Sequence, residues 1–143
     1  MSAFEPVIVA FACEYCAYTA ADMAGSLGLG YPANVKIVRV PCTGKVDSLH
    51  LMRALQKGAD GVLVAGCYLG DCHYKSGNLR AKKRVEYVQG LLNEIGVGGQ
   101  RVDMVFMSAG QGNVFARAAS DFTEKIRALG PNPVREGARK AAA

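Results

Sequence analysis

The chain has 143 residues, of which 50% are hydrophobic and 20% are charged, and its formal net charge is +5. This length and composition predict one compact domain with a substantial core. No apolar run reaches the length of about 18 residues that a membrane span needs, and the start MSAFEPVIVAF has no basic region or small-residue cleavage site. We therefore expect a cytoplasmic protein without a membrane span. A modest positive charge without interleaved aromatic residues gives little support for nucleic acid binding.

The first half of the chain predicts two strand-helix units. An apolar strand over residues 7–11 precedes a short helix that ends at the glycines near Gly28. A second strand over residues 35–40 precedes a helix that Asp47 caps and that ends at Gly58. The predicted inward positions of this second helix are Leu49, Met52 and Leu55.

The second half repeats the pattern twice. The run GVLVAG from Gly61 has no polar alternation, which is typical of a buried parallel strand, and Asn78 can cap the long helix that follows its loop. A strand over residues 102–107 precedes a helix over residues 114–129, which Gly130 and Pro131 terminate. The predicted inward positions of these two helices are Val85, Val88, Leu92, Ile95, Phe115, Ala119, Phe122, Ile126 and Leu129.

Alternating strands and helices predict an α/β fold with helices on both faces of a parallel sheet. We expect a flavodoxin-like, doubly wound four-stranded sheet of order 2-1-3-4 in one domain over residues 1–130, followed by an irregular tail over residues 131–143. In this order the first and third strands are neighbours, and the crevice above their carboxyl ends is where such folds bind ligands.

Cysteines follow three of the four predicted strands. Cys13, Cys42 and Cys67 each stand directly after a strand, so we expect a row of thiols along one sheet edge. Cys16 and Cys72 lie a few residues further into the loops. Five cysteines in a reducing compartment do not predict a disulfide framework, and their clustering predicts a metal site or redox chemistry.

The spacing leaves the kind of metal open. Cys13-x-x-Cys16 serves zinc sites, iron-sulfur clusters and thiol-disulfide exchange alike, whereas the Cys67-x4-Cys72 spacing also occurs among plant-type iron-sulfur ligands. A thioredoxin-like enzyme would leave the other cysteines unexplained. His73 is a weak candidate ligand because histidine-ligated clusters use two histidines, and His50, the other histidine, lies inside a helix.

Basic residues follow the Cys67–Cys72 loop, where they could dock an acidic partner. They are Lys75, Arg80, Lys82, Lys83 and Arg84.

Four segments together resemble the delta, or D, subunit of methyl-viologen-reducing hydrogenase, the small iron-sulfur protein that accompanies heterodisulfide reductase. They are FACEYCAYTAADMAG, VRVPCTGKVD, GADGVLVAGCYLGDCHYKSGN with Arg84 downstream, and the closing helix that ends in LGPNP. The resemblance extends over residues 7–133, with no departure at the cysteine positions.

The resemblance implies a non-catalytic electron-transfer subunit with a [2Fe-2S] cluster. Such a protein relays electrons from a hydrogenase or formate dehydrogenase to the flavin-containing A subunit of heterodisulfide reductase, in an electron-bifurcating complex of methanogenesis-type energy metabolism. Four of the five cysteines would be ligands, namely Cys13, Cys42, Cys67 and Cys72, with Cys16 as the expected spare. Backbone amides would donate to the sulfurs, with Gly44, Gly70, Gly110 and Gly112 as candidates.

Two alternatives remain at this point. One is a zinc-stabilised interaction module that uses four of the cysteines. The other is a flavodoxin-like flavin protein, although the Cys-Glu-Tyr-Cys-Ala-Tyr loop after the first strand lacks the Ser, Thr and Gly of a phosphate cradle.

Overall fold

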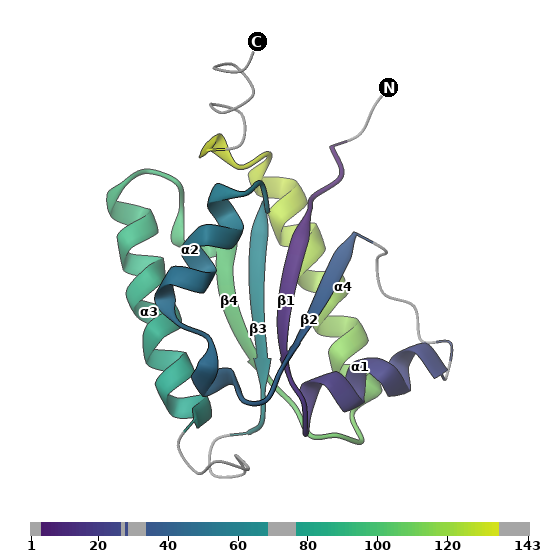
Figure 1. The fold of residues 1–143 in the computed structure, drawn as a ribbon. Helices are drawn as coiled ribbons and strands as arrows, with labels where there is room; N and C mark the ends of the chain where they lie inside the picture. Colours follow the sequence, from purple (N-terminus) through teal and green to yellow (C-terminus); the bar gives the residue numbers. More distant parts are fainter. Residues whose placement is uncertain (1–3, 27, 29–33, 69–76, 135–143) are drawn as a thin grey trace.

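The chain folds into a parallel sheet between two layers of helices (Figure 1). The computed structural model describes residues 4–26, 28, 34–68 and 77–134. Its elements in chain order are β1 (Ile8–Cys13), α1 (Ala17–Ser26), β2 (Val35–Val40), η1 (Thr43–Lys45), α2 (Ser48–Gln56), β3 (Gly61–Gly66), α3 (Gly77–Glu94), η2 (Gly99–Arg101), β4 (Val102–Phe106) and α4 (Gly112–Leu129). None of the helices in these ranges is both long and apolar enough to cross a membrane.

The predicted strand order is confirmed. The sheet has the order β2-β1-β3-β4, and every neighbouring pair is parallel. All six residues of β3 are buried because this strand lies inside the sheet and has helices on both faces. β1 and β3 are therefore neighbours, and the residues after their carboxyl ends emerge side by side.

Two hydrophobic clusters hold the helices against the sheet. On one face α1 and α4 pack together over a core that includes Ala10, Leu63 and Phe115 (Figure 1). On the other face α2 and α3 cover a core that includes Val64 and Val88. Burying large aliphatic and aromatic side chains on both faces supplies the main driving force for this fold.

Three predicted inward positions are wrong. Leu49 is 57% exposed, and the neighbouring Leu51 is fully buried, because α2 presents Leu51 and Leu55 to the sheet. Ile95 lies one residue beyond the end of α3 and Leu129 is the last residue of α4, and both are exposed because the chain turns away there. The other inward positions predicted for α3 and α4 are confirmed as buried.

Asp47 caps α2 as predicted, and His50 completes the cap. The Ser48 N–H donates to Asp47 Oδ1 at 2.7 Å, and the Asp47 N–H donates to His50 Nδ1 at 2.9 Å. The Asp47 side chain also accepts the backbone N–H of His50, so Asp47 and His50 form a capping box with histidine in the position that Glu or Gln usually occupies. His50 therefore has a structural role at the start of the helix.

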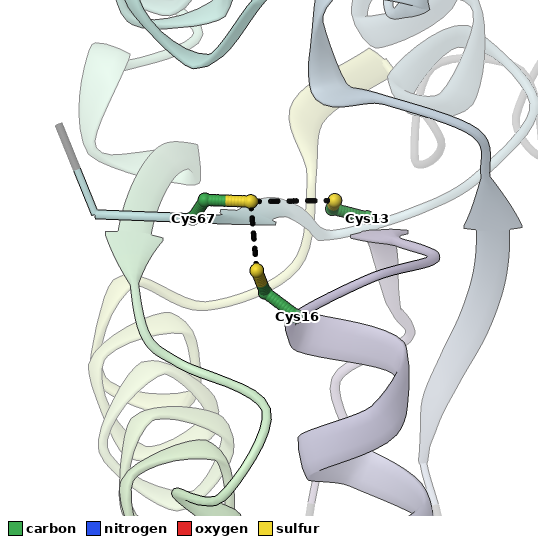
Figure 2. A group of neighbouring side chains, drawn as sticks. All are labelled: Cys13, Cys16 and Cys67. Atoms are coloured by element: carbon green, nitrogen blue, oxygen red, sulfur yellow. Dashed lines mark hydrogen bonds between the residues drawn. The ribbon is translucent and has the colours of Figure 1, made fainter. Parts of the chain in front are cut away.

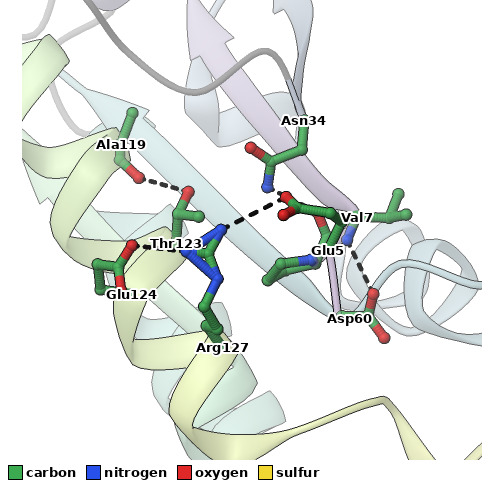
Figure 3. Close-up of polar contacts among 9 residues, drawn as sticks. Glu5, Val7, Asn34, Asp60, Ala119, Thr123, Glu124 and Arg127 are labelled. Atoms are coloured by element: carbon green, nitrogen blue, oxygen red, sulfur yellow. Dashed lines mark hydrogen bonds and ion pairs between the residues drawn. The ribbon is translucent and has the colours of Figure 1, made fainter. Parts of the chain in front are cut away.

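A buried polar network fixes the amino-terminal edge of the sheet. Asp60 is fully buried, and its carboxylate accepts the N–H of Val7 at 2.8 Å (Figure 3) and the N–H of Asn132 at 2.9 Å. The Asn132 side chain donates to the carbonyl oxygens of Leu55 and Ala59, and Arg101 donates to the carbonyl oxygen of Asp60. Because Asn132 is fully buried, the anchored chain extends past Pro131, where the sequence placed the start of an irregular tail. The domain boundary itself stays a prediction.

Candidate metal centre

Three cysteine sulfurs meet at the carboxyl edge of the sheet. The Sγ atoms of Cys13, Cys16 and Cys67 all lie within 4.8 Å of one another (Figure 2). The distance from Cys67 Sγ to Cys13 Sγ is 3.7 Å, and the distance from Cys67 Sγ to Cys16 Sγ is 2.8 Å. Cys13 and Cys67 are buried and Cys16 is half-buried. The three thiols thus form a compact, largely dry group of soft ligands.

The strand register brings Cys13 and Cys67 together. Cys13 is the last residue of β1, and Cys67 is the first residue after β3. The parallel pairing aligns Ala12 with Ala65, so both cysteines leave the sheet at nearly the same level. Both thiols belong to the core beneath α1 and α4, and Cys16 packs against that core.

Cys16 reaches the group from the start of α1. It directly precedes the helix, and its carbonyl oxygen accepts the Ala20 N–H at 2.9 Å, as an N-cap residue does. The amino-terminal end of α1 therefore lies beside the sulfurs. The partial positive charge of a helix amino terminus favours nearby thiolates over thiols.

Burial and hydrogen bonding shift the pKa of the Cys13 thiol in opposite directions. Burial raises the pKa of the Cys13 thiol above its ordinary value of 9.0, and the nearby Cys67 adds to the increase. The backbone N–H groups of Tyr15 and Cys16 donate hydrogen bonds to Cys13 and lower this pKa. At neutral pH the metal-free thiol is therefore protonated, and a bound metal cation would stabilise the thiolate.

The sulfur spacing can be compared with a tetrahedral thiolate site. Metal–sulfur bonds of about 2.3 Å at tetrahedral angles place two ligand sulfurs about 3.8 Å apart. The 3.7 Å between Cys13 and Cys67 fits this spacing without rearrangement. The 2.8 Å between Cys16 and Cys67 is shorter, so one metal held by both would require these sulfurs to separate by about 1 Å. The donor set therefore fits a thiophilic metal or cluster, with Cys16 as the side chain that must move.

Cys42 does not share the offset predicted from the sequence. β2 ends at Val40, which pairs with Cys13, so Cys42 lies two residues beyond the level of Cys13. Pro41 intervenes, and proline has no N–H to continue the hydrogen-bond ladder. Cys42 is buried, and its Sγ accepts the Gly44 N–H at 3.4 Å, as expected for Gly44. Cys42 is not part of the three-sulfur group.

Several predicted site residues lie outside the described ranges. They are Gly70, Cys72, His73 and Lys75. The ligand roles of Cys42 and Cys72, the spare role of Cys16, and the donor roles of Gly110 and Gly112 all stay predictions. The amide donors at Tyr15 and Cys16 were missed by sequence reasoning, although a short Cys-x-x-Cys turn before a helix could have indicated them.

The first turns of α3 hold both cysteine loops. Asn78 is buried, and its side-chain amide donates to the carbonyl oxygens of Cys67 at 2.9 Å and Tyr68 at 2.7 Å. Further along α3, the Arg84 guanidinium donates to the carbonyl oxygens of Gly44 at 2.6 Å and Val46 at 3.1 Å. Asn78 was predicted to cap this helix, but α3 begins one residue earlier, and the amide instead fixes the chain beside Cys67.

The architecture and site together define a class of protein: a doubly wound α/β domain with clustered thiols at the topological switch point of its sheet. Residues 8–130 match the family model described as methyl-viologen-reducing hydrogenase, delta subunit. The chain belongs to this family.

Relatives of similar length support the assignment. The chain is 50% identical over 131 residues to the iron-sulfur D subunit of the vhu F420-non-reducing hydrogenase of Methanocaldococcus jannaschii, and the match covers 92% of this chain and 98% of that protein. It is also 50% identical over 128 residues to the iron-sulfur D subunit of the F420-non-reducing hydrogenase of Archaeoglobus profundus, where the match covers 90% of this chain and 93% of that protein.

A longer relative contains a stretch that is similar to this chain. The chain is 39% identical over 126 residues to the A subunit of the ferredoxin/F(420)H(2)-dependent CoB-CoM heterodisulfide reductase of Methanosarcina acetivorans. The match covers 88% of this chain and 16% of that protein. A domain of this family is therefore similar to part of a heterodisulfide reductase polypeptide.

The contact between the Cys42 loop and α3 can be tested with two glycines. A Cβ at Gly44 would lie 2.8 Å from the Cα of Gly77, and a backbone atom cannot move aside as a side chain can. We expect Gly44→Ala to lower the free energy of unfolding by about 1–3 kcal/mol. Gly90→Ala is the matched control, because Gly90 lies inside α3 with nothing within 4 Å of the new Cβ, and it should stabilise by about 0.5–1 kcal/mol. Urea unfolding of both variants measures these changes, and a loss in both would contradict the steric explanation.

Proposed function

We propose that the protein is a non-catalytic electron-transfer subunit that carries one [2Fe-2S] cluster. In this role it accepts electrons from a hydrogenase or formate dehydrogenase and passes them to the flavin-containing A subunit of heterodisulfide reductase. The observation that carries the proposal is the convergence of Cys13, Cys16 and Cys67 at one sheet edge in a member of this family. The cytoplasmic location expected from the sequence stays a prediction.

The chemistry of the site supports an iron-sulfur cluster. Iron-sulfur clusters are held by thiolates, and hydrogen bonds from amides to the sulfurs adjust the reduction potential. The N–H groups of Tyr15 and Cys16 donate to Cys13, and that of Gly44 donates to Cys42. The relatives of similar length are named iron-sulfur subunits, which agrees with this donor set.

The longer relative supports the choice of partner. A heterodisulfide reductase polypeptide that contains a stretch similar to this chain holds the two parts at a high effective concentration. Where the parts are separate chains, a binding surface must replace the covalent link. We therefore propose that this protein docks on the A subunit of a heterodisulfide reductase with its cysteine edge toward the flavin, in an electron-bifurcating complex of the methanogenesis type.

The proposed ligands are four of the five cysteines. Cys13 and Cys67 fit best because their sulfurs are buried and spaced as two ligands of one metal would be. The set proposed from the sequence adds Cys42 and Cys72 and leaves Cys16 as the spare. The position of Cys16 Sγ within the group argues for an alternative set in which Cys16 replaces Cys42.

A zinc-stabilised module is the second candidate, because three clustered thiols also suit zinc. Zinc has no redox chemistry and no colour, so the metal content separates the two candidates.

The first test is composition. Protein purified without oxygen should contain about two irons and two acid-labile sulfides per chain, with the visible absorption and, after reduction, the paramagnetic resonance spectrum of a [2Fe-2S] cluster. A colourless preparation with one zinc, obtained under conditions that preserve iron-sulfur clusters, would contradict the proposal.

The second test assigns the ligands. Replacing the cysteines by serine one at a time should give four variants that lose or strongly alter the cluster spectrum and one that keeps it. Retention in Cys16→Ser supports the set proposed from the sequence, and retention in Cys42→Ser supports the alternative set. An unchanged spectrum in Cys13→Ser or Cys67→Ser would show that the sulfur group is not the cluster site.

The third test concerns docking. Lys82 and Lys83 lie in the first half of α3, and reversing both to Glu should slow association with the flavoprotein about tenfold at low salt. The matched control reverses Lys36 and Lys57, which are exposed and lie toward the amino-terminal edge of the sheet. Stopped-flow association rates should fall in the first variant more than in the control, while the cluster spectrum stays the same in both. Equal rates in the two variants would remove the support for docking through α3.

A further inference from the structure

A separate cavity lies beside the Cys42 loop. It has a volume of 440 Å³, which is within the range of about 300–1,000 Å³ typical of small-molecule sites. The lining residues are Pro41, Cys42, Gly44, Lys45, Arg80 and Arg84. The cavity therefore opens between the chain that follows β2 and the first turns of α3.

The lining of this cavity is positively charged. Lys45, Arg80 and Arg84 contribute three cations, and the lining residues within the described part of the chain include no Asp or Glu. The ion pairs found in the described ranges involve other residues: Lys82 with Glu86, Lys125 with Asp103, and Arg127 with Glu5 and Glu124. Three like charges around one hollow repel one another unless an anion lies between them.

Arg84 is held in place before any ligand arrives. Its Nη1 donates to the carbonyl oxygens of Gly44 and Val46, which fixes one side of the guanidinium against the Cys42 loop. A guanidinium has five N–H donors, so the groups on its other nitrogens remain for a ligand in the cavity. A pre-positioned fork of this kind suits an oxyanion with several acceptor oxygens.

We propose that this cavity binds a phosphate group, held by Lys45, Arg80 and Arg84. Two guanidinium groups and one ammonium group match the charge and the oxygen count of a phosphate better than those of a single carboxylate. The cavity volume also leaves space for the small molecule that carries the phosphate. This site is a property of the folded chain and does not depend on the identity of the metal.

If the proposed function is correct, the site also affects the cluster. Cys42 lines the cavity, so a phosphate bound there adds negative charge beside a candidate cluster ligand. Negative charge disfavours the reduced cluster, so bound phosphate should lower its midpoint potential, and reduction should weaken phosphate binding by the same factor. This consequence rests on the proposed function, whereas phosphate binding itself does not.

The test is calorimetric titration of the oxidised, metal-loaded protein at constant ionic strength, with inorganic phosphate and a nucleoside monophosphate as separate probes and chloride as the competing anion. We expect saturable binding at one site per chain, weakened about tenfold by Arg80→Gln and further by adding Lys45→Gln. Lys83→Gln removes the same charge from an exposed position on α3 outside the cavity lining, and it should change the affinity by less than about twofold. Tighter binding of either probe identifies whether the free ion or a phosphate ester is preferred.

Three results would overturn the proposal. One is the absence of saturable binding of either phosphate probe by the folded protein. Another is an equal loss of affinity in Lys83→Gln and Arg80→Gln, which would indicate a general charge effect. The third is phosphate binding by the metal-free protein that disappears on metal loading, which would indicate that the cluster itself occupies the cavity. A zinc-containing protein that still binds phosphate would refute the proposed function and leave this site standing.

Discussion

The parallel pairing of β1 with β3 is the constraint on which the site depends. Parallel strands share one carboxyl edge, and the strand order places β1 beside β3. Cys13 and Cys67 therefore meet without any long loop to position them, although 54 residues separate them in sequence. The close packing of β3 maintains this alignment, since a Cβ at Gly61 would lie 2.7 Å from the Ile126 side chain of α4. The sulfurs of Cys13 and Cys67 are thus positioned by the two central, closely packed strands of the sheet.

α3 extends this order into the loops. Its Asn78 amide fixes the carbonyl groups beside Cys67, and its Arg84 guanidinium fixes those of the Cys42 loop. A single helix thus controls two segments that bear candidate ligands. Charge-assisted and buried hydrogen bonds are the stronger ones, so these contacts fix the backbone at Cys67, Tyr68, Gly44 and Val46 firmly. The same helix carries Arg80 and Lys83 at exposed positions, so the loop contacts and this surface charge come from one element.

The sequence predicted the strand order and the sulfur pair at β1 and β3 because periodicity and right-handed crossovers allow few alternatives. The sequence could not show that Cys42 lies two residues beyond Cys13 along the strand direction. That offset is set by the register of β1 with β2, which pairs Cys13 with Val40, and register depends on tertiary pairing. The inward face of α2 was also misjudged, since Leu49 and Leu51 both follow Asp47 closely and only packing selects Leu51. Asn78 and Asn132 each fix the backbone of a segment that is distant in the sequence or lies across a loop. A local sequence pattern contains no information on such contacts.

The charge balance at the sulfurs explains why a buried thiol group and amide donors occur together. Burial raises the pKa of Cys13, which favours the neutral thiol of this residue in the core. Two backbone N–H groups and the amino-terminal end of α1 favour the opposite, charged form. Neither tendency alone would suit the proposed redox centre. Thiolates without a metal cation would repel one another, and a wholly apolar site would resist the negative charge of a thiolate-bound cluster. With the proposed metal bound, the cation would supply the charge that converts these packed core thiols into a set of thiolate ligands.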